Sequence, residues 1–192
     1  MMKKLNYSLR IISILIGLYR LITYGAPSIS DTLMYLGIIP ITFLPVIINK
    51  FFKVKIPAKL ETIYLIFIIL AYDLGSINRL YSKIYWFDTF NHFISGIISG
   101  IVAIWTLKNL KKYQSKDKIF NIIYIIAFTM MIASFWELIE FSIDNILNLD
   151  VQKVKTTGVN DTMKDIFCAL LGGITFIIST KFIKIKEFIK NI

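Results

Sequence analysis

Six long apolar blocks decide what this chain can fold into. Each is rich in Ile, Leu and Phe and close to the ~20 residues that a helix needs to cross a bilayer core of about 30 Å. In lipid the backbone must satisfy its own hydrogen bonds, which favours helices over strands despite the β-branched content. We therefore predict an all-α, polytopic bundle of six transmembrane helices. The blocks are Leu9–Tyr24, Leu33–Ile48, Leu60–Ile77, Phe87–Leu107, Ile119–Phe141 and Met163–Phe182.

The composition excludes several classes of protein. Of 192 residues, 56% are apolar and 18% charged, whereas soluble domains carry about 25% charged residues. A soluble enzyme, a nucleic-acid-binding domain and a disordered chain are excluded. The six blocks fill a single integral membrane domain over residues 1–192 and leave no room for a folded domain outside the membrane. Lys3 and Lys4 before the first block resemble a signal peptide, but Arg20 interrupts the block and no A-x-A pattern follows, so we interpret it as a retained helix.

The lysines and arginines predict how the helices are oriented. They gather in alternate connections, and cytoplasmic loops carry the excess of such residues. The net charge of +10 therefore reflects topology, with both termini cytoplasmic, and no nucleic-acid partner is expected. The basic clusters are Lys3, Lys4 and Arg10 at the start of the first block, Lys50, Lys53, Lys55 and Lys59 after the second, Lys108, Lys111, Lys112, Lys116 and Lys118 after the fourth, and Lys181, Lys184, Lys186 and Lys190 at the end of the sixth.

Eight ionisable groups gather at the opposite, extracytoplasmic ends of four blocks. Helical spacing places those within each block on one face, because residues three or four apart are neighbours on a helix. These groups are Asp73 in the third block, Asp88 and His92 in the fourth, Glu137, Glu140 and Asp144 at the end of the fifth, and Asp161 and Asp165 at the start of the sixth.

Carboxylates inside a membrane are energetically costly, so their presence requires a compensating interaction. An Asp at mid-helix costs about 2.5–3.5 kcal/mol on insertion scales, so a cluster must be protonated, paired or bound to a metal. Arg20 is a candidate partner, because a mid-span arginine needs one too. Simple capping of helix starts also explains Asp88 and Asp161, and His92 alone could be an ordinary hydrogen-bonded side chain. Neither cap nor solvent explains Glu137 and Glu140.

Other features have structural interpretations. Gly96 and Gly100 form a G-x-x-x-G pattern that predicts close helix packing, as do Gly172 and Gly173. Pro40 and Pro45 predict a kinked second helix. The segment from Ser142 to Asn160 is the longest outer connection, and the sequence allows either a short surface helix or an extended piece. The single cysteine, Cys168, is interpreted as a small buried hydrophobe.

Three motifs resemble the YjdF-like bacterial membrane proteins. They are YSKIYWFDTFNHFISG at residues 81–96, FWELIEF at 135–141 with Asp144 after it, and DTMKD at 161–165 followed by Gly172. The resemblance implies a multi-pass protein of the bacterial cytoplasmic membrane and supplies no reaction. A weaker likeness to VanZ-like membrane proteins rests on an Asp…His pair, a later Glu and a later Asp. The arginine expected shortly before that last Asp is absent.

These patterns support a membrane enzyme or cation site built on a divalent metal. Carboxylates with one imidazole suit Mg²⁺, Mn²⁺, Ca²⁺ or Zn²⁺, and the outer location suits a lipid or envelope-precursor substrate. We expect Glu137, Glu140 and His92 to be catalytic and Asp73, Asp144 and Arg20 to support the site. The predicted metal ligands are Asp88, His92, Glu137, Glu140, Asp161 and Asp165.

Two alternatives stay open. A proton- or cation-coupled transporter would use intramembrane acids as relay groups, although six spans without a repeat are few for such a protein. A structural or partner-binding membrane protein would join the acids in a hydrogen-bond network. The lipid bilayer is a partner in every case, and the sequence leaves the oligomeric state open.

Overall fold

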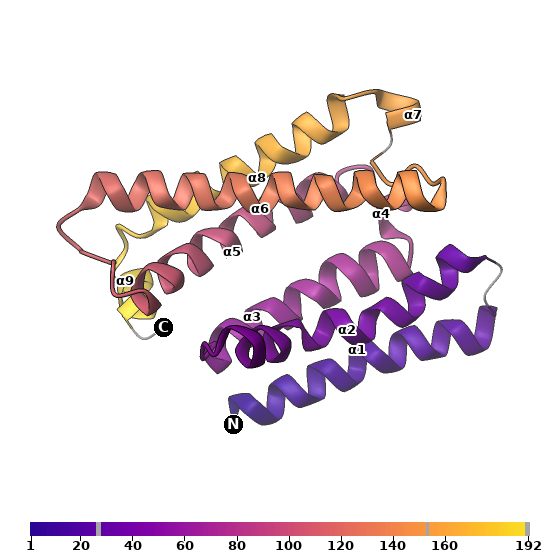
Figure 1. The fold of residues 1–192 in the computed structure, drawn as a ribbon, viewed down its shortest axis with the longest axis horizontal. Coiled ribbons are helices and arrows are strands. Elements are labelled where there is room, and N and C mark those ends of the chain that lie inside the picture. Colours follow the sequence, from indigo (N-terminus) through magenta and orange to yellow (C-terminus); the bar gives the residue numbers. More distant parts are fainter. Residues whose placement is uncertain (26–27, 153, 191–192) are drawn as a thin grey trace. The chain divides into compact units, whose positions relative to one another are not determined.

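The computed structural model describes residues 1–25, 28–152 and 154–190, and these residues are helical or lie in short connections. Within them, six helices are long and apolar enough to cross a membrane, which confirms the all-α, six-span prediction. The described chain forms two compact units, residues 1–87 and 88–192, which are considered separately (Figure 1).

The first unit contains three spans. They are α1 (Met2–Tyr24), α2 (Ile29–Phe52), and a third span made of α3 (Ala58–Ile68) continued by a π-helix, η1 (Ile69–Ile77). The short α4 (Leu80–Lys83) follows. The Ser28 side chain caps α2 by accepting a hydrogen bond from the Asp31 amide at 3.1 Å, which satisfies one of the free amides at a helix start.

Two local features of this unit differ from a uniform apolar helix. The α2 helix continues through Pro40 and Pro45, as neighbouring helices in a membrane allow. The third span does not stay α-helical as its apolar run suggests, because its last nine residues are π-helical. A run of apolar residues indicates that a segment lies in lipid. It does not indicate where a helical turn holds an extra residue, as a π-helix does.

The second unit contains the other three spans. They are α5 (Phe87–Asn109), α6 (Lys118–Leu147) and α8 (Asn160–Ser179), with the short α7 (Val154–Thr157) before α8 and α9 (Ile183–Lys190) after it. The α6 helix ends where Asn148 adopts a left-handed conformation with φ 54°, which Asn tolerates better than most residues. The connection between α6 and α8 holds the short helix α7, which is one of the two options that the sequence allowed.

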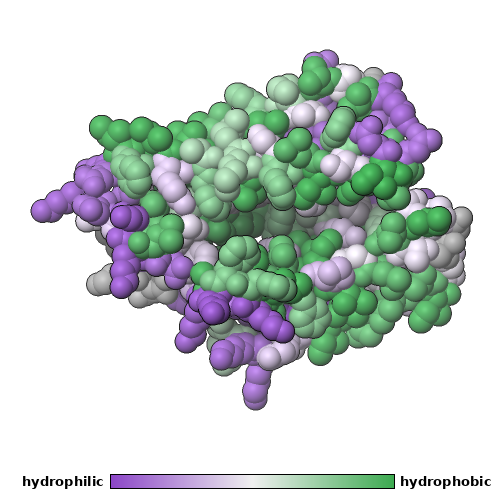
Figure 2. Space-filling view, viewed as in Figure 1, coloured by the Kyte–Doolittle hydropathy of each residue, from purple (hydrophilic) through white to green (hydrophobic). Residues whose placement is uncertain are grey.

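Apolar residues lie outside as well as inside both units. The second unit has a buried cluster of Ala103, Ile104, Ile125, Phe176 and Ile189. Many large apolar side chains are nevertheless exposed, and Figure 2 shows broad apolar areas along the helices. Exposed apolar patches of this extent are expected of a surface that faces lipid.

Candidate functional site

Glycines bring α5 and α8 into backbone contact in the second unit. A Cβ atom on Gly96 would stand 1.9 Å from the Ala169 carbonyl oxygen, and one on Gly172 would stand 2.0 Å from the Phe93 carbonyl oxygen. Only glycine allows this approach, so the close packing predicted from the small residues is confirmed. His92 lies one turn before Gly96, and Asp165 lies one turn before Ala169, so the contact carries both side chains to the same place.

Three ligand-type side chains converge there. The His92 Nε2 atom lies 3.6 Å from Asp88 Oδ1, one turn away on α5, and 3.7 Å from Asp165 Oδ2 on α8. Asp88, His92 and Asp165 each offer one ligand atom, and these atoms lie within 4.8 Å of one another. His92 and Asp165 are buried, with 8% and 4% of their surface exposed. The structure thus shows a carboxylate and histidine cluster between two spans.

A lysine compensates part of the negative charge beside this cluster. The Lys164 ammonium lies 2.5 Å from Asp161 Oδ1 and 3.8 Å from Asp165 Oδ1. The latter oxygen is buried and has no hydrogen-bond partner among the described residues. Because a buried carboxylate oxygen without a partner is costly, this atom marks a place where a further positive group would be stabilising.

The donor set fits a divalent cation in composition and spacing. Ligand atoms about 2.1 Å from a metal lie about 3.0–3.4 Å apart in octahedral or tetrahedral arrangements. The separations of 3.6 and 3.7 Å around His92 Nε2 need only small side-chain movements to reach that range. Asp88, His92 and Asp165 could therefore hold a metal, and the mixed nitrogen and oxygen donors suit Mn²⁺ or Zn²⁺.

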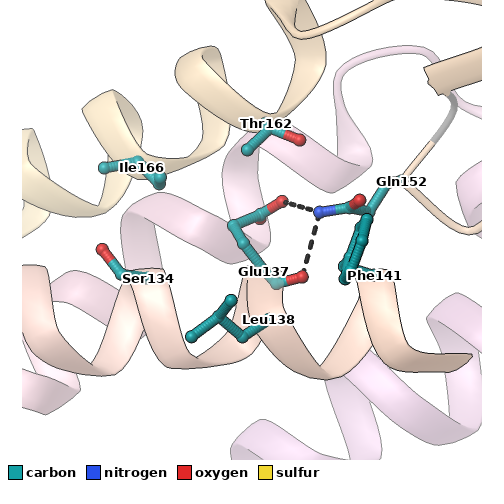
Figure 3. A pocket seen from close by; sticks show the side chains of 7 residues that line it. All are labelled: Ser134, Glu137, Leu138, Phe141, Gln152, Thr162 and Ile166. Atoms are coloured by element: carbon teal, nitrogen blue, oxygen red, sulfur yellow. Dashed lines mark hydrogen bonds between the residues drawn. The ribbon is translucent and has the colours of Figure 1, made fainter.

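Glu137 lines an open pocket on the adjoining side of α8 (Figure 3). The pocket measures about 420 Å³ and lies between α6, α8 and the connection that carries Gln152. The Gln152 side-chain amide donates to the Glu137 carboxylate at 3.2 Å and to the Glu137 main-chain carbonyl at 2.9 Å. The lining residues are Ser134, Glu137, Leu138, Phe141, Gln152, Thr162 and Ile166.

The first turns of α8 connect the pocket with the cluster. Thr162 and Ile166 are one turn apart and line the pocket, while Asp161 and Asp165 are one turn apart and bear the acidic groups. Neighbouring residues on a helix differ by about 100° around its axis. The two pairs therefore form adjoining stripes on one helix, and the pocket and the cluster share a wall.

The remaining predicted residues of this unit have partners of their own. The Trp136 indole donates to Glu140 Oε1 at 2.9 Å. The Asp144 carboxylate accepts the main-chain amides of Val151 at 2.6 Å and Gln152 at 3.0 Å. Asp144 thereby ties the outer connection to the end of α6, which gives this carboxylate a role in holding the loop.

Two predicted supporting residues lie in the first unit. Asp73 lies in η1 and accepts a hydrogen bond from the Ser13 hydroxyl at 2.5 Å. Arg20 of α1 donates to the Asn78 side-chain oxygen and lies over the Tyr24 ring. Its partners are therefore an amide and an aromatic ring, where the sequence suggested a carboxylate.

Sequence reasoning missed Gln152 and Ser13. Gln152 is 8% exposed although it lies in a polar connection, and Ser13 is 1% exposed within an apolar block. A glutamine in a loop carries no signal of burial. Ser13 could have been found, because Asn6, Arg10, Ser13 and Gly17 recur at helical spacing on α1.

Comparison with known proteins places the chain among membrane proteins. A family model described as "Predicted membrane protein (DUF2238)" matches residues 8–186. The YjdF-like resemblance is consistent with that family, and nothing supports the likeness to VanZ-like proteins. Comparison with curated proteins and with solved structures gives no match.

Proposed function

The chain belongs to this family of predicted membrane proteins, and from that premise we propose that it is a divalent-metal-dependent enzyme of the bacterial cytoplasmic membrane. The proposal rests on one observation, the convergence of one ligand atom each from Asp88, His92 and Asp165 within 4.8 Å of one another. Two carboxylates and an imidazole from two spans form a donor set that is expensive to bury without a cation.

The chemistry proposed for the metal is that of a Lewis acid. A bound divalent ion polarises a phosphoryl or carbonyl oxygen, or lowers the pKa of a bound water so that it becomes a nucleophile. His92, Asp88 and Asp165 would bind it, and Lys164 would hold Asp161 beside it through their 2.5 Å contact. Mn²⁺ and Zn²⁺ match the mixed donors best, with Mg²⁺ and Ca²⁺ as the other candidates.

The pocket beside α8 is the proposed substrate site. Its apolar side chains, which include Leu138, Phe141 and Ile166, suit the acyl or isoprenoid part of a lipid or lipid-linked envelope precursor. Its buried carboxylate, Glu137, is 5% exposed and is the proposed general base, with Gln152 orienting it. Glu140 lies one turn further along α6, and its carboxylate is proposed to add negative charge near that base.

The site is proposed to lie on the extracytoplasmic side. Within the second unit, the acidic groups lie at the start of α5, the end of α6 and the start of α8, whereas Lys108 and the lysines of residues 110–118 lie at the other end of these helices. The positive-inside rule assigns the lysine-rich end to the cytoplasm.

Metal analysis of the purified protein tests the ion. We expect about one divalent ion per chain in the wild type, and at least a tenfold loss of affinity in Asp165→Asn and in His92→Ala. Asp144→Asn is the matched control, because its carboxylate holds loop amides. A wild type that folds and turns over substrate without any divalent ion would refute the proposal.

Measurement of turnover distinguishes the role of the proposed base, Glu137, from that of the proposed ion. Extracted bacterial lipids and lipid-linked precursors are incubated with the protein, with and without a chelator, and products are identified by mass spectrometry. Glu137→Gln is expected to retain the metal and lose at least a hundredfold in rate, within the usual contribution of a general base. Full activity in Glu137→Gln would remove this residue from the mechanism.

A structural role is the competing candidate, supported by the fixed partners of Glu137 and Asp144. Under that alternative, Asp→Asn and Glu→Gln variants change only the stability of the fold. Metal binding in the wild type together with metal-dependent turnover decides against it.

A further inference from the structure

The first unit buries a polar face of α1. The buried residues of α1 are Asn6, Arg10, Ser13 and Gly17, which recur at spacings of four, three and four and so share one side of the helix. Apolar residues such as Ile11 and Leu15 are exposed instead. Between Asn6 and Gly17 this face extends for about 16 Å at 1.5 Å per residue, roughly half of a bilayer core.

Most polar groups on this face have matched partners. The Thr62 hydroxyl donates to the Asn6 side-chain oxygen at 2.6 Å. The Arg10 guanidinium lies 2.6 Å from the Glu61 carboxylate and also donates to the Thr42 carbonyl at 3.1 Å. Arg10 and Glu61 therefore neutralise one another inside the unit.

Asp73 is the exception. It is 0% exposed, and among the described residues its side chain accepts one hydrogen bond, from the Ser13 hydroxyl to Oδ2 at 2.5 Å. Its Oδ1 atom is buried and has no hydrogen-bond partner among the described residues. An ionised carboxylate in this setting would cost several kcal/mol without a compensating cation.

No side-chain cation of the described part of this unit compensates it. Arg10 is engaged by Glu61 at 2.6 Å, and Arg79 lies 3.6 Å from Asp31. Arg20 is held by Asn78 and the Tyr24 ring. The side chain shown to contact the Asp73 carboxylate is that of Ser13, which offers a hydroxyl oxygen and no positive charge. An exchangeable cation would supply the charge that these arginines do not.

The backbone around Asp73 has a local π-helical conformation. It lies within the π-helix η1, and π-helical turns are frequent at functional sites. Its main-chain carbonyl accepts hydrogen bonds from the Asn78 amide at 2.9 Å and from the Asn78 side chain at 2.7 Å. These two bonds fix the turn and hold the carboxyl group toward Ser13 of α1.

We propose that Asp73 and Ser13 hold one exchangeable monovalent cation, a proton or Na⁺, within the first unit. A single carboxylate balances one positive charge, which favours a monovalent over a divalent ion, and the oxygen donors of Asp73 and Ser13 are hard ligands. The site lies in the other unit from the proposed metal centre and does not depend on the enzyme proposal.

Infrared spectroscopy of the protein in lipid vesicles tests this directly. Spectra are recorded at pH 7 in choline chloride, without Na⁺, and the Asp73→Asn spectrum is subtracted from that of the wild type. We expect the difference to contain the C=O stretch of a protonated carboxylic acid, which moves in D₂O because the proton exchanges. Addition of NaCl then distinguishes the ions: loss of the band indicates that Na⁺ replaces the proton, and an unchanged band indicates a site for protons alone.

Control variants keep the test decisive. Asp144→Asn is expected to give no acid band, because its carboxylate accepts two main-chain amides. Ser13→Ala keeps the carboxyl group and removes its hydrogen bond, so it should shift the Asp73 band to higher frequency even where Asp73→Asn does not fold. Absence of an acid band from the wild-type difference spectrum in choline chloride, or a band unmoved by both D₂O and Ser13→Ala, would overturn the proposal.

Discussion

The Ala169 carbonyl oxygen occupies the space that any side chain on Gly96 would need. The separation of 1.9 Å between that oxygen and a Cβ atom built on Gly96 lies far inside van der Waals contact. The pairing of α5 with α8, and hence the approach of His92 to Asp165, depends on the absence of one methyl group.

Gly96→Ala is therefore expected to separate the two helices. The backbone of Ala169 cannot rotate away as a side chain could, so we expect a loss of about 1–3 kcal/mol in stability and a several-fold loss of divalent-ion affinity. Thermal unfolding in detergent and ion titration measure the two effects. Ser95→Ala is the control, because among the described residues the Ser95 hydroxyl donates to the His92 carbonyl of its own helix. Equal effects in both variants would contradict the packing argument.

Lys164 would compete with the proposed metal for the carboxylates of α8. Its ammonium lies 3.8 Å from Asp165 Oδ1, and the Lys164 side chain is 40% exposed, so water screens part of its charge. Lys164→Met should raise the affinity for Mn²⁺ or Zn²⁺ by about tenfold, equivalent to about 1.4 kcal/mol. Calorimetric titration of the two proteins checks this, and a weaker affinity in Lys164→Met would show that the hold of Lys164 on Asp161 outweighs its competition with the ion.

Removal of one partner of the Arg10 and Glu61 pair should destabilise the fold more than removal of both, as is typical of buried ion pairs. Glu61→Gln leaves the Arg10 side chain, which is 5% exposed, without its counter-charge, and we expect a loss of about 3 kcal/mol in stability. The double variant Arg10→Gln with Glu61→Gln should recover part of it, because no charge remains buried. Unfolding equilibria in mixed micelles measure the cycle, with exposed Lys50→Gln as control. Additive losses in the double variant would show that the pair is not coupled.

Cysteine labelling tests which face of the membrane holds the acidic groups. After Cys168→Ala, single cysteines are placed by Ser115→Cys in the lysine-rich connection and by Lys155→Cys in the outer connection. A membrane-impermeant maleimide should label Lys155→Cys in intact cells and Ser115→Cys only after lysis. The reverse pattern would invert the proposed orientation and place the site on the cytoplasmic side of the membrane.

Much of the architecture could be predicted because lipid imposes simple rules. The apolar runs located all six spans, and the structure extends most of them by a few residues, as in α6, which continues to Leu147. Helices commonly continue beyond the bilayer core into polar sequence, where hydropathy no longer marks them. The π-helical end of the third span and the partners of Asp73 depend on contacts between helices, which periodicity does not encode.

The candidate site was predictable in part for the same reason. Helical spacing paired Asp88 with His92, and the glycine patterns indicated close packing, but neither could identify α8 as the neighbour that brings Asp165 to His92. Gln152 was not predictable, because its burial depends on how the connection after α6 folds back on Glu137. Long-range pairing of that kind leaves no trace in a local pattern.

The two adjoining stripes on α8 have a mechanical consequence. Thr162 and Asp165 belong to the same turn of α8. A molecule in the pocket that displaces Thr162 would therefore also displace the Asp165 carboxylate. If the proposed ion is bound, filling the pocket and adjusting its ligands would be one movement, and a substrate of the wrong width would displace the proposed ligands.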